Sequence, residues 1–313
     1  MSLIEQAAKR LEQLRNAGVE LPDDSQLHSP SAVLKTKPLE TTSVTIPTTP
    51  TTPTVGMATP PPQASAPAKR VEIHLEAIAA SGLLVPHATR SKLADEFRVI
   101  KRPLIANAMG RGSLTIENGN LIMITSALPG EGKSFTAINL AISIAMELDN
   151  TVMLVDADVA RPSVLNMLGL PPAPGLLDVL DKNSVDISSV LMRTNIEKLS
   201  ILPSGTQHPR ATELLASDAM VRLLDDMANR YKDRIIVFDS PPLLLTTESR
   251  AIATHMGQIV LVVNAGHTLQ SAVMQAVATI EACPIKMMVL NQSRQATSDG
   301  YGYGYGYGYG DDV

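Results

Sequence analysis

A glycine-rich segment near the middle of the chain contains the residues best suited to chemistry. Residues 127–134 read Ala-Leu-Pro-Gly-Glu-Gly-Lys-Ser, between an apolar run that predicts a strand and a pattern that predicts a helix. In such a loop the backbone amides curl around phosphate groups, Lys133 reaches the β and γ oxygens, and the Ser134 hydroxyl binds Mg²⁺. The spacing therefore predicts a phosphate-binding loop rather than a plain glycine-rich turn. The residues expected to contact the nucleotide are Pro129, Gly130, Glu131, Gly132, Lys133, Ser134 and Phe135.

Three carboxylates follow two other apolar runs. Asp156 and Asp158 end one run, and Asp239 ends another. Because ligands of open parallel sheets bind at the carboxyl ends of the strands, these acids are expected beside the loop. Acidic groups repel phosphates unless a cation lies between them, so the pattern predicts Mg²⁺ held by Ser134, Asp156 and Asp239. For either member of the first pair alone, capping of the next helix is the alternative.

The elements that must position these residues alternate along residues 71–297. Short runs that are nearly all apolar alternate with helical patterns, as in parallel strands covered by helices on both faces. The alternation predicts an α/β domain with a doubly wound, mostly parallel sheet of the phosphate-loop NTPase type, preceded by a charged helix at about 90–108. The predicted strands are Leu121–Thr125, Val152–Val155, Leu199–Leu202, Ile235–Phe238, Ile259–Val263 and Lys286–Leu290.

The two ends of the chain differ in composition from this domain. Residues 1–20 join a capping-box pattern, Ser2 with Glu5, to apolar residues at helical spacing, which predicts an amphipathic helix. Residues 21–70 are rich in Pro and Thr and predict an extended, disordered linker. Residues 298–313 alternate glycine with tyrosine and predict a flexible tail.

Composition argues against several classes of function. The net charge is 26 − 31 = −5, and the only aromatic residues are six tyrosines and three phenylalanines. Few aromatic residues and no large basic cluster argue against a nucleic-acid-binding protein. The single cysteine, Cys283, cannot form an internal disulfide, and no apolar run is long enough to span a membrane. We therefore expect an intracellular protein.

Four motifs together point to a known family. The phosphate loop, Asp-Ala-Asp-Val-Ala-Arg-Pro at 156–162, Asp-Ser-Pro-Pro at 239–242 and the tyrosine-rich end resemble a bacterial protein-tyrosine kinase, over about residues 85–313. With its opening residues and its linker, the chain is most similar to the cytoplasmic autokinases of exopolysaccharide (exosortase-associated) loci. The resemblance implies ATP and Mg²⁺ as cofactors, a homo-oligomeric ring, and a cytoplasmic location at the inner membrane. It also implies a separate membrane chain-length-determinant protein as partner, and a tyrosine phosphatase.

The resemblance also implies roles for single residues. The catalytic residues would be Lys133, Asp156, Asp158 and Asp239. One of the first two acids would accept the proton of the incoming tyrosine, and we favour Asp158. The family usually has arginine two residues after that acid, where this chain has Ala160, so the role of Arg161 stays open. Asn291, after the last strand, would contact the adenine.

A charged helix face and the tail would serve assembly and phosphate transfer. The family carries Glu-x-x-Arg-x-x-Arg on a helix that joins subunits, and Asp95, Arg98 and Lys101 keep this spacing on one face. A solvated charged face explains the same pattern nearly as well. A glycine-rich tail of this length reaches roughly 20 Å, enough for a neighbouring subunit's cleft. The expected phosphate acceptors are Tyr301, Tyr303, Tyr305, Tyr307 and Tyr309.

Two other functions remain open at this point. An ATPase of the chromosome-partitioning or division-site class has the same fold, but its loop typically carries an extra lysine where this chain has Leu128. Such an ATPase also has no use for a tyrosine tail. A nucleotide-gated scaffold of polysaccharide export would bind ATP without transferring phosphate. Formation of phosphotyrosine separates the three functions.

Overall fold

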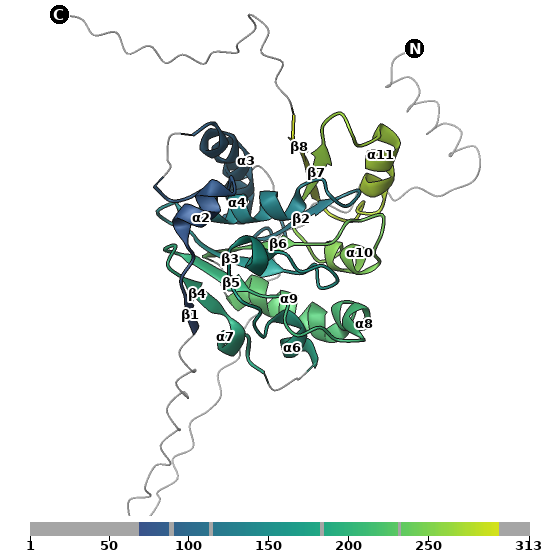
Figure 1. Ribbon diagram of the computed structural model, residues 1–313. Coiled ribbons are helices and arrows are strands. Elements are labelled where there is room, and N and C mark those ends of the chain that lie inside the picture. Colours follow the sequence, from purple (N-terminus) through teal and green to yellow (C-terminus); the bar gives the residue numbers. More distant parts are fainter. Residues whose placement is uncertain (1–68, 88–90, 113–114, 182–184, 231–232, 294–313) are drawn as a thin grey trace, which may run out of the picture. The chain divides into compact units, whose positions relative to one another are not determined.

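The computed structural model describes residues 69–87, 91–112, 115–181, 185–230 and 233–293 (Figure 1). The helix predicted at 1–20, nearly all of the predicted linker and the tyrosine tail lie outside these residues. The first described element, the short strand β1 (Lys69–Val71), begins within the range predicted as linker. Within the described residues, no helix is long and apolar enough to cross a membrane.

Eight strands form one sheet, in the order β1-β4-β5-β3-β6-β2-β7-β8. Neighbouring strands are parallel except β4 and β5, so the predicted mostly parallel sheet is confirmed. All six predicted strands are present, and the short strands β1 and β4, at one end of the sheet order, are additional. The strands after β1 are β2 (Leu121–Ser126), β3 (Thr151–Asp156), β4 (Met192–Thr194), β5 (Leu199–Leu202), β6 (Arg234–Asp239), β7 (Gln258–Asn264) and β8 (Ile285–Asn291).

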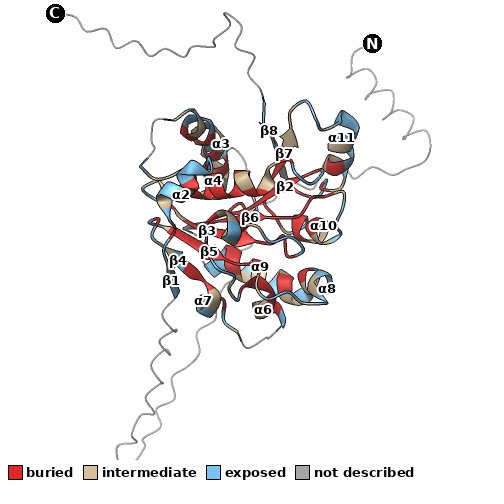
Figure 2. Ribbon diagram, in the orientation of Figure 1, coloured by how far each residue is buried: buried red, intermediate tan, exposed pale blue. Residues whose placement is uncertain are grey.

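Helices cover both faces of this sheet. Side chains alternate between the two faces along each strand, and the apolar ones on each face pack against helices. Ile122 and Ile124 of β2 pack with α2 to α5, whereas Leu121 and Met123 pack with α6 to α11. Figure 1 shows α2, α3 and α4 on one side and α6, α8 and α9 on the other, and Figure 2 shows the buried strands between them. The helices are α2 (Leu75–Ala80), α3 (Lys92–Ala108), α4 (Lys133–Ala145), α5 (Val164–Met167), α6 (Leu176–Asp181), α7 (Ile187–Val190), α8 (Ala211–Leu215), α9 (Asp218–Arg230), α10 (Glu248–Ala253) and α11 (Gln270–Ala278).

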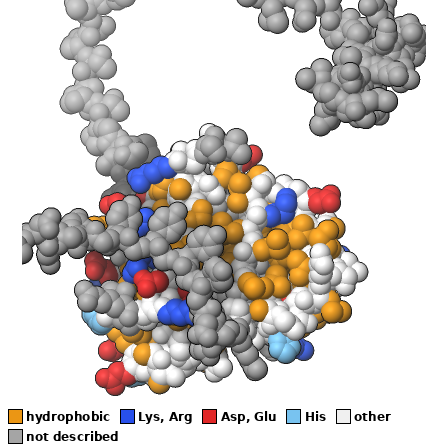
Figure 3. Space-filling model, turned by 90° about the horizontal axis from the view of Figure 1, so that it is seen from above, with side chains coloured by type: hydrophobic (Ala, Val, Ile, Leu, Met, Phe, Trp, Pro, Cys, Tyr) orange, Lys and Arg blue, Asp and Glu red, His pale blue; other side chains and the backbone are white. Residues whose placement is uncertain are grey.

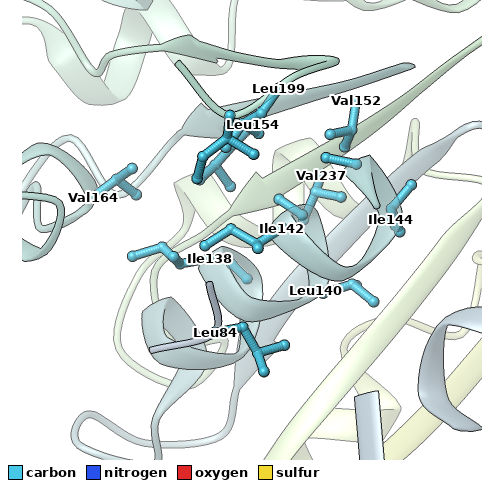
Figure 4. Packing of buried hydrophobic residues seen from close by; sticks show 14 of the residues in the cluster. Leu84, Ile138, Leu140, Ile142, Ile144, Val152, Leu154, Val164, Leu199 and Val237 are labelled. Atoms are coloured by element: carbon cyan, nitrogen blue, oxygen red, sulfur yellow. The ribbon is translucent and has the colours of Figure 1, made fainter. Parts of the chain in front are cut away.

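Helix α4 positions the phosphate loop, because the loop leads directly into its first turn. Nearly every residue of this helix is buried, since α3 covers the side that does not face the sheet. Ile138 and Ile142 of α4 lie close to Leu154 and Val237 of the strands (Figure 4). Replacing one such buried isoleucine by alanine costs about 2–5 kcal/mol of stability. The loop is therefore anchored on the best-packed helix of the domain.

Helix α3 is the charged helix that the sequence predicted, but only two of the three residues expected on its charged face, Asp95 and Arg98, pair with each other there. Asp95 and Arg98 are exposed and form an ion pair with each other. Lys101 is only 5% exposed, and its Nζ lies 2.6 Å from Oε1 of Glu147 and donates to the carbonyl of Ser143 over 2.6 Å. This corrects the expected placement of Lys101 on the exposed face, because the turn of the helix directs it against α4.

Apolar side chains are exposed at the β8 edge of the sheet and on the neighbouring helix α11. They are Leu269, Met274, Met288 and Leu290. Figure 3 views the side of the molecule on which β8 and α11 lie and shows apolar side chains grouped between scattered charges. Grouped exposed apolar residues commonly mark surfaces that contact another molecule.

Candidate active site

The loop between β2 and α4 has the backbone that a phosphate cradle requires. Gly130 and Gly132 adopt φ angles of 80° and 93°, in the left-handed region that favours glycine. At Gly132 a side chain would also have no room, because its Cβ would lie 2.0 Å from Nδ2 of Asn291. Glycine is therefore favoured at position 130 by backbone conformation, and at position 132 by both backbone conformation and the close contact with Asn291.

The loop is tied to β7 and β8 by hydrogen bonds. The side-chain amide of Asn291 donates to the carbonyl of Glu131 over 2.9 Å. The buried carboxylate of Glu131 accepts from the amide of Leu128 over 2.6 Å and from the hydroxyl of Thr268. The sequence predicted nucleotide contacts for Glu131 and Asn291, whereas both side chains hold the loop here. Thr268 was not predicted, and no local motif marks it.

Lys133 and Asp158 form an ion pair at the base of the loop. The lysine Nζ lies 2.7 Å from Oδ2 of Asp158, and both side chains are largely buried. Oδ1 of Asp158 also accepts from the backbone amide of Arg161 over 3.2 Å. Asp158 therefore orients the lysine that the sequence assigned to the phosphates. The side chain of Arg161 is exposed, as is Ala160.

Asp156 and Asp239 lie side by side at the carboxyl ends of β3 and β6, where they are paired in register. Oδ2 of Asp156 accepts from the amides of Ser163 and Val164. Among the described residues, Oδ1 of Asp156 and both carboxylate oxygens of Asp239 are buried without a hydrogen-bond partner. Like charges placed opposite each other in a sheet are destabilising. Within the described part of the chain, these oxygens also lack the hydrogen-bond partners that ionised carboxylates need, so the ionised form of the pair is disfavoured on both counts.

The electrostatics of the two acids follow from this placement. Burial and the neighbouring charge of Asp239 raise the pKa of Asp156 from 3.8 to about 7, against the opposing effect of its two backbone hydrogen bonds. Burial raises the pKa of Asp239 to about 6, although Lys133 and the nearby Ser134 hydroxyl favour its charged form. A bound cation would remove the cost of ionising both groups.

The donor set fits a magnesium ion that completes its shell with phosphate and water. Mg²⁺ usually takes one or two carboxylates together with phosphate oxygens, and the oxygens of Asp239 and Oδ1 of Asp156 are available. Ser134 lies in the same group, where its hydroxyl accepts from that of Ser163 over 2.8 Å. No cluster of three or more His, Cys, Asp or Glu side chains among the described residues could hold a metal by itself.

The comparisons with known proteins identify the family. The family model described as an AAA domain matches residues 119–291, more than half of the chain. The tyrosine-protein kinase YwqD of Bacillus subtilis is 34% identical over 167 residues, which cover 53% of this chain and 69% of YwqD. The chain belongs to the bacterial protein-tyrosine kinase family. The resemblance that the sequence motifs indicated is thus confirmed.

Other members of the kinase family match shorter or longer parts of the chain. The succinoglycan biosynthesis transport protein ExoP of Rhizobium meliloti is 34% identical over 188 residues, 59% of this chain, but the match spans only 23% of ExoP. The crystal structure of the chimerical protein CapA2B2 covers 66% of this chain and 89% of its own at 29% identity, with a TM-score of 0.56. This chain is therefore similar to CapA2B2 in fold over most of the described residues.

The structure brings most of the predicted site residues together and separates a few. The loop, Lys133 and the three acids lie at the carboxyl ends of the central strands, and Asn291 lies at the carboxyl end of the edge strand β8. The side chain of Phe135 instead packs into the core beneath α4, and Asp95 and Arg98 lie apart on α3. The tail tyrosines are outside the described residues.

Proposed function

We propose that this chain is an ATP-dependent tyrosine autokinase that phosphorylates its C-terminal tyrosines. The observation that carries the proposal is the row of acids beside the phosphate loop, two of them buried with unpartnered oxygens, in a chain whose relatives are named tyrosine kinases. The C-terminal sequence of the same chain, with five tyrosines, supplies acceptor hydroxyls. The acids and the acceptors together distinguish a kinase from a plain nucleotide-binding domain.

The residues around the loop would bind ATP and Mg²⁺. Backbone amides of residues 129–134 and the ammonium of Lys133 would contact the phosphates. Ser134 and Asp239 would hold Mg²⁺, which would neutralise phosphate charge as it develops during transfer. Asn291, which now supports the loop, would stay beside the nucleotide. This arrangement explains why the buried acids are retained despite their cost to the nucleotide-free fold.

Asp156 would accept the proton of the acceptor tyrosine. The tyrosine oxygen attacks the γ-phosphorus, the bond from that phosphorus to the β–γ bridging oxygen breaks, and ADP leaves with the bonding electrons. The phenol proton passes to the carboxylate. The sequence favoured Asp158 for this role, but Asp158 is paired with Lys133. Of the two oxygens of Asp156, Oδ1 is the one without a partner among the described residues, so we assign it to the proton rather than to the metal.

Transfer of phosphate to a tail tyrosine would take place between subunits of a homo-oligomer. Asp95 and Arg98 on α3 are the proposed subunit contacts, and Arg102 is exposed on the same helix in place of the buried Lys101. Five added phosphates would bring roughly −8 to −10 charges to the tails, so we propose that phosphorylation loosens the oligomer. We also propose a membrane chain-length-determinant protein as partner and a phosphatase that removes the phosphate. A role in exopolysaccharide export is supported by the similarity to ExoP, which is named a succinoglycan biosynthesis transport protein.

Incubation of the purified chain with ATP and Mg²⁺ tests the proposed function. Mass spectrometry of the tail should find phosphate on several of the five tyrosines, and Lys133→Ala and Asp239→Asn should each reduce it about 100-fold or more. Production of ADP without phosphotyrosine would instead support the partitioning-type ATPase. Nucleotide binding with neither product would support the scaffold.

A further inference from the structure

A cavity of about 640 Å³ opens beside Asp156, on the side of the carboxylate row that faces away from Asn291 and the β8 edge. Its walls come from α5, from the segment between α5 and α6, and from the segment between β5 and α8. The deeper lining is apolar, with Leu165, Leu170 and Ala173, and the mouth is formed by exposed residues that include Pro172 and Pro174. The volume lies within the range of roughly 300–1,000 Å³ that small-molecule and side-chain pockets occupy.

The walls of this cavity are joined by hydrogen bonds, so its shape is part of the fold. Oδ2 of Asp178, in the first turn of α6, accepts from the amide of Gly175 on one wall over 2.8 Å and from the amide of Thr206 on the other over 2.9 Å. The amide of Leu176 also donates to the carbonyl of Pro203 over 2.8 Å.

Gly175 is required where the two walls meet. A Cβ at this position would lie 2.0 Å from the carbonyl oxygen of Pro203, so the backbones could not approach as they do. Close backbone contact and the bridging carboxylate of Asp178 together hold the cavity open in the absence of any ligand. Little reorganisation is then needed when a ligand enters.

The chemistry of the cavity matches one kind of side chain. Its lining combines apolar surface for a flat ring with the polar residues Asn166, Ser204, Thr206 and Gln207. The one ionisable side chain in the lining is Asp156, whose Oδ1 is buried and lacks a partner among the described residues. A phenol has an apolar ring and one hydroxyl that must find an acceptor when it is buried. An aliphatic side chain would leave the carboxylate oxygen unpaired, and a phosphate group would be repelled by it.

We propose that this cavity is the acceptor subsite, which takes the ring of the tyrosine to be phosphorylated and directs its hydroxyl toward Asp156. The inference rests on the proposed kinase function. Glycines on either side of each tail tyrosine have no side chains to collide with Pro172 and Pro174 at the mouth. Asp178 is a positioning residue of this acceptor subsite, because it acts only through the walls that it joins.

Filling the cavity tests the proposal. We expect Ala173→Trp to keep nucleotide affinity and thermal stability but to raise the KM for a Gly-Tyr-Gly-Tyr-Gly peptide at least about 10-fold, the affinity that burying such a ring supplies. Ala173→Ser should behave as wild type. Ala282→Trp, a tryptophan at an exposed position far along the chain, is the matched control and should also behave as wild type.

Asp178 provides a second, independent variant. Asp178→Ala should raise the peptide KM with little change in kcat or in nucleotide affinity, whereas Asp178→Asn, which keeps an acceptor oxygen, should recover most of the loss. A loss of stability shared equally by both variants, with an unchanged KM, would show a purely structural role and would contradict the assignment.

The outcomes separate this inference from the proposed function. If the wild-type chain transfers phosphate and Ala173→Trp does so with an unchanged peptide KM, the acceptor subsite is wrong while the kinase stands. If Ala173→Trp weakens nucleotide binding instead, the cavity belongs to the nucleotide. If the wild type transfers no phosphate, the kinase fails. Binding of the fluorescently labelled peptide to the ADP-loaded wild type but not to Ala173→Trp would then still support the subsite, and equal binding would overturn it.

Discussion

The two sides of the candidate active site differ in how completely their polar groups are paired. On the loop side, the carboxylate of Glu131, the amide of Asn291 and the ammonium of Lys133 all have partners within the domain. On the strand side, Asp239 has no hydrogen-bond partner on either oxygen among the described residues, and Asp156 lacks one on Oδ1. The loop is thus complete before any ligand binds, and the acid pair is not.

This difference indicates where the fold accepts a cost for the sake of function. A paired loop keeps its shape for phosphate, and catalysis benefits from groups that need no reorganisation. Two ionised acids in register repel each other, and burial makes this more costly because water no longer solvates their charges. The acid pair therefore favours a cation or a proton, and we expect changes on the two sides of the site to affect activity and stability in different proportions.

Removing the cation of the loop side should have the largest effect. Lys133→Ala takes away a phosphate ligand and leaves Asp158 buried without its partner, so tail phosphorylation should fall about 100- to 1,000-fold or more. Lys286→Ala, at a lysine near the amino end of β8, is the control and should retain activity. The measurement is phosphotyrosine formed per hour, by mass spectrometry. Equal activity of the two variants would remove Lys133 from the mechanism.

On the strand side, activity and stability should change in opposite directions. Asp239→Asn should reduce phosphorylation about 100-fold, because the Mg²⁺ ligand is lost. The same change should stabilise the nucleotide-free protein at pH 8 by about 1–3 kcal/mol, because the unpaired buried charge disappears. Thermal unfolding with and without nucleotide measures both effects. If the nucleotide-free Asp239→Asn variant is less stable than wild type, the buried charge of Asp239 does not destabilise the fold.

The pH dependence of stability should reveal the same strain without a mutation. Both acids have a pKa that is higher in the folded chain, about 7 and about 6, than the unfolded value of 3.8. Between about pH 4 and pH 7 the folded chain binds more protons, so the contribution of the pair to stability is present at low pH and is lost as the pH rises. Urea unfolding of wild type and Asp239→Asn should show a flatter dependence in the variant. Parallel curves would contradict the assignment.

The smallest effect should come from the paired side chain of Asn291. Asn291→Ala removes one hydrogen bond to the loop, worth about 1 kcal/mol, so nucleotide affinity should fall about fivefold. ATP and GTP should be weakened equally if the residue only supports the loop. A loss confined to ATP would instead restore the adenine contact that the sequence predicted.

The sequence was sufficient for the parts of the molecule that depend on local pattern. The six predicted strands are nearly all apolar, and the ends of β3 and β6 locate Asp156, Asp158 and Asp239 at the carboxyl ends of the sheet. The loop spacing located the phosphate site in the same way. The short strands β1 and β4 are three residues long and partly exposed, so they lack the apolar run that marks the others.

The sequence was insufficient where a role depends on contacts far apart in the chain. Lys101 is charged and lies on a charged helix, yet its position against α4 gives it Glu147 as partner. Asp178 is one acid among many until the structure brings Gly175 and Thr206 to the same oxygen. Likewise, only the ion pair with Lys133 separates the role of Asp158 from that of Asp156.

The most direct test of the kinase account separates the donor of phosphate from its acceptor. The donor carries phenylalanine at all five tail tyrosines, and the acceptor is the full chain with Lys133→Ala, so neither can phosphorylate its own tail. In an equimolar mixture with ATP and Mg²⁺, mass spectrometry should find phosphate on tail tyrosines of the acceptor. Adding Asp239→Asn to the donor should prevent it. An acceptor tail that stays unmodified with the active donor would contradict the account.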